Sequence, residues 1–260
     1  MSYIINRYKS RFGKELKPLG FKLYKKTFYR VVNDILQIVI LVKTPSSCTV
    51  EFDLVSLALG ISDLYWEAGY SVAHFRKDAL ARDWWFEPSL EFFDNDTNSF
   101  SKIAYDDKQM DEIVEDMLTI MISEVIPVLE RGVDAKTAYA ELIQIEKMVR
   151  RGVHIDLRPD YGLAMLCIQS GDYDIAQQHL IGILERWDKA YPNQIAKHEE
   201  WGIDKPDLLF DRFLDDYKEL KNLYDRLSKL DTEYLQNFIL IKKMKSLEYL
   251  RDPRTRKKDK

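Results

Sequence analysis

The apolar positions of the chain change their spacing near residue 20. From Ile4 to Leu19 they recur every three or four residues, which is typical of a helix, and Gly20 follows where a helix C-terminus favours glycine. Residues 21–32 then read as two short extended pieces, and Asn33 with Asp34 is a turn signal. The pattern therefore predicts one helix followed by a hairpin.

The next two stretches predict the centre of a sheet. ILQIVILVK (35–43) is a run of mostly apolar, β-branched residues, as expected of its most buried strand. CTVEFDLVSL (48–57) alternates instead, with Val50, Phe52 and Leu54 on one face and polar residues on a solvated face. Residues 70–93 add a further hairpin or edge strand. Together these segments predict an antiparallel meander.

Beyond residue 108 the pattern predicts helices alone. The first covers 108–130 and ends near Pro127. Asp134, Pro159 and Asp172 each mark the start of another helix. Two long helices follow, at 207–228 and 232–250.

These elements define the fold class that we expect. It is α+β, an antiparallel β-sheet with packed helices over residues 1–130, followed by an all-α helical domain over 131–250 and a flexible basic tail over 251–260. The domain boundary falls near 131–133.

Composition places the chain among globular proteins, because 46% of its 260 residues are hydrophobic and 32% are charged. The first ten residues lack a secretory apolar core, and no apolar run is long enough to span a bilayer. Cys48 and Cys167 share no CxxC spacing and read as reduced thiols. We therefore expect a cytoplasmic protein that does not cross a membrane.

Charge is unevenly distributed around the net value of −4. Residues 1–30 hold nine lysines and arginines against Glu15 alone, a local charge of +8. Residues 51–130 hold five basic against eighteen acidic residues, a local charge of −13, and the last ten residues carry +4. This layout predicts either internal pairing between the basic start and the acidic middle or a surface dominated by one sign.

The first half resembles a known family. LKPLGFKLYKKTFYRVVNDILQIV (16–39), DWWF (83–86) and EVIPVL (124–129) together resemble the bacterial family catalogued as domain of unknown function 4304, over about residues 1–130. The resemblance implies an α+β fold and supplies no activity. Some members of that family look like interaction or immunity-type proteins.

A second segment, LAMLCIQSGDYDIAQQHLIGIL (163–184), is similar to a tetratricopeptide hairpin. Its small residues Ala164 and Ala176 flank a turn at Gly171. No second copy follows at the roughly 34-residue period of that motif, and one repeat cannot bury its own face. A generic helical hairpin within a bundle is therefore the favoured interpretation.

Signatures of catalysis and of cofactor binding are absent from the sequence. It contains no Gly-rich phosphate loop, no GxSxG elbow and no zinc spacing among its four histidines. Asp94 and Asp96 mimic a calcium loop, but Ser99 and Tyr105 replace its glycine and its closing glutamate. We therefore expect no catalytic residue, no metal and no cofactor.

Trp84 and Trp85 stand out because adjacent residues of a strand point to opposite faces. Either both are buried, one in the sheet–helix core and one at the domain junction, or one is an exposed anchor for a partner. The acidic residues around them could attract a basic partner, although those at a helix start also interact favourably with the helix macrodipole. The partner-binding candidates are Trp84, Trp85, Asp94, Asp96, Asp106, Asp107, Asp111 and Glu115.

Nucleic-acid binding is not favoured, because stacking needs aromatic and basic side chains on one accessible face. Alternation turns Phe21, Leu23 and Phe28 inward and leaves Lys22, Tyr24 and Lys26 outward, which is a thin basic face.

The leading functional hypothesis is a non-catalytic protein-binding module, immunity-like or regulatory, whose acidic 83–116 region meets a basic protein. One alternative is an enzyme whose site unites His74, Arg30 and Asp83 from distant segments. The other is a nucleic-acid binder that uses residues 1–30 and the basic tail.

Overall fold

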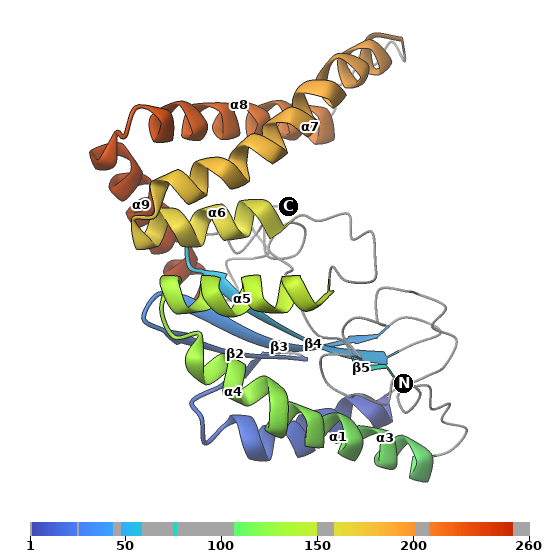
Figure 1. Ribbon diagram of the computed structural model, residues 1–260. Coiled ribbons are helices and arrows are strands. Elements are labelled where there is room, and N and C mark those ends of the chain that lie inside the picture. Colours follow the sequence, from blue (N-terminus) through green and yellow to red (C-terminus); the bar gives the residue numbers. More distant parts are fainter. Residues whose placement is uncertain are drawn as a thin grey trace. The chain divides into compact units, whose positions relative to one another are not determined.

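The computed structural model describes residues 2–24, 26–43, 48–58, 75–76, 107–149, 159–200 and 208–251 (Figure 1). Its contacts divide the chain into two compact units. Unit 1 holds the described residues up to Leu57, residues 75–76 and residues 107–149; unit 2 holds Ala58 and the described residues from Pro159 onward. An antiparallel sheet with helices precedes a helical region, so the predicted fold class is confirmed.

The sheet of unit 1 is an antiparallel meander in the order β1-β2-β3-β4-β5. The apolar run predicted as the most buried strand forms its centre, between the second and fourth strands. Only residues 75–76 of the predicted 70–93 hairpin belong to the described part of the chain, and they pair with the fourth strand. The strands are β1 (Lys22–Tyr24), β2 (Thr27–Val32), β3 (Ile35–Lys43), β4 (Cys48–Ser56) and β5 (Phe75–Arg76).

The turn between β2 and β3 consists of the two residues that the sequence marked. Asn33 and Asp34 both have positive φ, 43° and 73°, as a type I′ turn requires. Asn and Asp tolerate this region better than other residues with a side chain. Val32 therefore pairs directly with Ile35, and this register sets which residues of β3 face the core.

Helices pack on the sheet of unit 1 from both sides. Figure 1 shows α1, α3 and α4 below it and α5 on the opposite side, where α5 contacts β4. Tyr8 and Phe12 of α1 are buried with Phe28 and Phe52 of the sheet, and the Tyr8 hydroxyl donates to the Val39 carbonyl at 3.1 Å. The helical segments are α1 (Ser2–Leu16), α3 (Asp107–Ile120), the π-helical turn η2 (Met121–Val125), α4 (Ile126–Arg131) and α5 (Ala135–Val149).

The first strand departs from its predicted pattern at one residue. Phe21 and Phe28 are buried as expected, but Leu23, predicted to face inward, is about one-third exposed, at 36%. Leu23 lies in the short edge strand β1, where only β2 is a neighbour. An edge position covers a side chain from one flank only, so alternation alone overestimates its burial.

Pro127 does not end its helix, although the sequence predicted an end there. The chain passes through η2 and continues as α4 to Arg131. In η2 the backbone N–H of Ile126 bonds to the carbonyl of Met121, five residues back, and Pro127 sits in the first turn of α4. Proline is tolerated at that position because its missing N–H is not needed there.

A buried amide joins the sheet to the helices. Gln37 of β3 is fully buried; its Nε2 donates to the carbonyls of Leu129 and Gly132 at 2.5 and 3.0 Å. Its Oε1 accepts a bond from Arg30 Nε at 2.7 Å. Because every polar atom of this amide has a partner, the burial carries no unsatisfied group.

Residues 131–133, where the sequence predicted a domain boundary, lie within unit 1. Helix α5 clusters with unit 1, and the Gly132 backbone that precedes it is held by Gln37. Asp134 caps α5 as predicted, since the Thr137 N–H donates to its carboxylate at 2.8 Å. The glycine and the capping residue at 132–134 thus mark the start of α5.

Unit 2 contains four described helices: α6 (Pro159–Ser170), α7 (Tyr173–Glu200), α8 (Leu208–Ser228) and α9 (Thr232–Arg251). The residues of α6 from Leu163 to Ile168 are all buried. Such a helix, apolar on every side, belongs at the centre of a bundle. It contacts α7 and α9, while α8 contacts α7 and α9.

Two of the helix connections in unit 2 use the same left-handed turn. Gly171 (φ 83°) closes α6, and the Asp172 N–H bonds to the Cys167 carbonyl at 2.8 Å. Leu230 (φ 51°) closes α8 in the same way, with the Asp231 N–H bonded to the Arg226 carbonyl at 3.0 Å. Glycine suits this position, whereas a residue with a Cβ is strained there.

We expect Leu230→Gly to raise the free energy of unfolding by about 1 kcal/mol, because it relieves the left-handed strain of an exposed side chain. Chemical denaturation followed by circular dichroism measures this change. Leu230→Ala is the control, since it keeps the Cβ and the strain. Equal effects of the two substitutions would show that the strain is not the cause.

Candidate protein-binding surface

Two of the predicted partner-binding carboxylates are engaged within unit 1. Asp111 of α3 accepts two bonds from Arg7 of α1, at 2.6 and 2.9 Å, and one from the Tyr3 hydroxyl at 2.9 Å. The Glu115 carboxylate, one turn later, accepts hydrogen bonds from Nε and Nη2 of Arg11. Internal pairing, one of the two alternatives that the charge layout left open, is thus present at these two sites.

The pairs shift the pKa values of Asp111, Arg7 and Arg11. Burial alone raises the pKa of Asp111, but the hydrogen bonds from Arg7 and Tyr3 outweigh it and hold that pKa below its ordinary value. The bond to Asp111 raises the pKa of Arg7, and the bond to Glu115 raises the pKa of Arg11. The contact between α1 and α3 therefore contains two arginine–carboxylate ion pairs.

The other partner-binding candidates are not described by the structure. Trp84, Trp85, Asp94, Asp96 and Asp106 lie outside the described residues, and Asp107 is placed only as the first residue of α3.

Only one of the three residues proposed for an enzyme site, Arg30, belongs to the described part of the chain. His74 and Asp83 fall outside the described residues, and Arg30 has a structural role. Its Nη1 donates to the Leu19 carbonyl at 2.6 Å and its guanidinium lies 4.7 Å from the centre of the Phe21 ring. Burial lowers the pKa of Arg30. Within the described ranges, no group of three or more His, Cys, Asp or Glu side chains could hold a metal ion.

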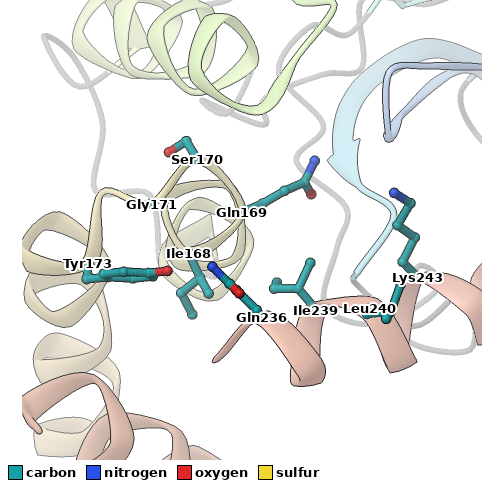
Figure 2. Close-up of a pocket in the computed structure, with 9 residues that line it drawn as sticks. All are labelled: Ile168, Gln169, Ser170, Gly171, Tyr173, Gln236, Ile239, Leu240 and Lys243. Atoms are coloured by element: carbon teal, nitrogen blue, oxygen red, sulfur yellow. The ribbon is translucent and has the colours of Figure 1, made fainter. Parts of the chain in front are cut away.

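Unit 2 contains an open groove of about 410 Å³. Figure 2 shows residues of α9 along one side of it, and the C-terminal end of α6 with the start of α7 on the other. The lining residues are Ile168, Gln169, Ser170, Gly171, Tyr173, Gln236, Ile239, Leu240 and Lys243.

The turn at Gly171 gives the groove its shape. Ser170 Oγ donates to the Asp172 carboxylate at 2.7 Å, so the turn is braced from within. Gly171 has no side chain, and a Cβ built there would meet no atom within 4 Å. No side chain therefore closes the groove at Gly171, next to Tyr173.

Helix α9 exposes large apolar side chains beside this groove. Leu240, Ile241 and Met244 are 51%, 55% and 61% exposed. They lie within one turn of each other, and Leu240 also lines the groove, so the stripe and the groove are one surface. We call the groove residues together with Ile241, Met244 and Lys245 the α9 surface.

The charge of the α9 surface has one sign near its centre. Between Glu233 and Glu248 the helix carries Lys242, Lys243 and Lys245 and no carboxylate. Lys242 is paired with Glu219 of α8 at 2.6 Å, and Lys243 interacts with other residues of the chain. Lys245 is exposed and makes no ion pair within the part of the chain that the structure describes.

The sequence contained a signal for this surface that the periodicity did not use. Phe238, Ile239, Leu240 and Ile241 are four consecutive apolar residues, which cover every side of a helix. Such a helix is either buried all round or exposes part of the run. The lysines that follow at once exclude burial all round, so an exposed apolar stripe could have been predicted.

No family model, curated protein or solved structure matches this chain. The resemblance to domain of unknown function 4304 and the similarity of 163–184 to a tetratricopeptide hairpin therefore stay predictions. Among the described residues, no helix is long and apolar enough to cross a membrane.

We expect Asp111→Asn to speed hydrogen exchange of the α1 amides near neutral pH. The folded pKa of Asp111 lies below its unfolded value, so its pairing stabilises the fold above about pH 4 and is lost as pH falls through the folded pKa. The difference between variant and wild type should therefore vanish in acid. Mass spectrometry corrected for intrinsic rates measures it.

Glu112→Gln is the control for this comparison, because Glu112 is an exposed neighbour on the same helix. It should leave α1 exchange unchanged at every pH. If α1 exchange still differs between Asp111→Asn and wild type in acid, the Arg7–Asp111 ion pair is not the cause of the difference.

Proposed function

We propose that this protein is a non-catalytic protein-binding module, regulatory or immunity-like in kind, that uses the α9 surface. The main support for this proposal is that Leu240, Ile241 and Met244 are exposed next to one another beside an open groove. Single apolar side chains are common on protein surfaces, but a contiguous group beside a groove is typical of an interaction site.

The acidic region is a weaker candidate for the binding surface. Asp111 and Glu115 form intramolecular pairs with Arg7 and Arg11, so a basic partner would have to displace two arginines that are already in place. Such a competition reduces the net gain from any new ion pair. We therefore assign the contact to α9 rather than to α3.

We also propose that the protein acts in the cytoplasm. The supporting observation is that Cys167 is buried and forms no disulfide, as is usual for cysteines in reducing compartments.

The test uses the purified full chain as bait for a displayed library of random peptides. Leu240→Glu and Met244→Glu should each lower the affinity for the selected peptides about 10-fold or more, because each puts a charge into an apolar contact. Calorimetric titration with synthetic peptides measures the affinities. Circular dichroism checks that each variant is folded.

Ile181→Glu is the matched control, because Ile181 is an exposed apolar residue of α7 in the same unit that does not line the groove. It should leave affinity unchanged. If no peptide is enriched, or if the α9 variants bind as tightly as wild type, the proposed function is wrong.

A further inference from the structure

The α9 surface has the chemistry of a particular partner. Its centre is apolar, with Ile168, Ile239 and Leu240 in the groove and Ile241 and Met244 beside it. A complementary segment must therefore bring at least two large apolar side chains, spaced to reach both the groove and the stripe. Leu240 connects the two areas and is the natural centre of the contact.

The polar groups of the groove are neutral donors and acceptors. Gln236 presents a primary amide, and Tyr173 presents a hydroxyl. These groups suit the amides of a polypeptide, which donate and accept hydrogen bonds along its length. The hydrocarbon of a bilayer offers no such partners, so a groove lined with amides favours a peptide over a membrane.

The charged residues that belong to the α9 surface are Lys243 and Lys245, and the Asp172 carboxylate beside the groove accepts a hydrogen bond within its own turn. None of the nine lining residues is Asp or Glu, and Lys243 is among them. Lys245 adds an exposed ammonium next to Met244, while the nearest carboxylate of α9 is Glu248, toward its C-terminal end. The complement of this layout is an apolar segment with carboxylates at its flank.

We infer that the α9 surface binds an acidic, amphipathic segment of another protein, an inference that rests on the proposed function. The apolar side chains of the segment cover Leu240, Ile241 and Met244, and its carboxylates meet Lys245 and Lys243. Because Lys243 also has contacts within the chain, Lys245 is the cation that the test uses.

The test compares three designed peptides with one apolar pattern, flanked by glutamates, by glutamines or by lysines. Isothermal titration calorimetry with the full chain should give a dissociation constant for the glutamate peptide about 10-fold lower than for the lysine peptide. Added salt should narrow the difference, because the charges are exposed. Leu240→Glu should weaken all three peptides.

Lys245→Glu provides the charge-reversed arm. It should weaken the glutamate peptide and strengthen the lysine peptide, while Lys189→Glu, an exposed control on α7, should change neither. If the α9 surface binds the three peptides equally, the acidic partner is wrong and the proposed function stands. If no peptide binds in a manner that depends on Leu240, the proposed function is also wrong.

Two further outcomes would overturn the inference. One is Leu240-dependent binding to phosphatidylserine vesicles without peptide binding, which would assign the surface to a membrane. The other is a concentration-dependent dimer in analytical ultracentrifugation that Leu240→Glu abolishes, which would assign it to a second copy of the chain.

Discussion

The turn between α6 and α7 fixes the shape of the groove in the proposed binding surface. Gly171 takes a left-handed conformation that lets the Asp172 N–H reach back to the Cys167 carbonyl, and the Ser170 hydroxyl braces the Asp172 carboxylate. The end of α6 and the start of α7 are thereby held next to each other. Because α9 contacts α6, this same turn forms one wall of the groove and α9 the other.

Unit 1 relies on another kind of interaction. Its sheet is joined to the helices by the buried amide of Gln37, and α1 is joined to α3 by two arginine–carboxylate pairs. In both cases the polar groups are hydrogen-bonded to other groups of unit 1. Arg30 bonds to Gln37, and Asp111 bonds to Arg7, so neither is a free functional group. The described polar clusters of unit 1 thus have structural explanations that need no ligand.

Signals that act within a few residues could be predicted from the sequence, and signals that act between distant segments could not. The Asn33–Asp34 turn, the Asp134 cap and the Gly171 end each follow from one residue's own backbone preference. The pair Arg7–Asp111 joins residues 104 positions apart, so the charge layout predicted pairing but not the partners. The continuation past Pro127 depends on a π-helical turn that no single residue encodes.

Helices α8 and α9 differ in the kind of side chain that they expose to solvent. Both helices bury one face in unit 2, with Leu223 of α8 and Leu235 of α9 fully buried. Among the residues of α8 whose side chains the structure describes, between Leu214 and Ser228, the exposed ones are all polar. The bundle therefore folds with a polar outer face on one helix, and polar residues at 240, 241 and 244 would serve α9 equally well. Under the proposed function, a contact outside the unit is the physical reason for apolar residues at these exposed positions.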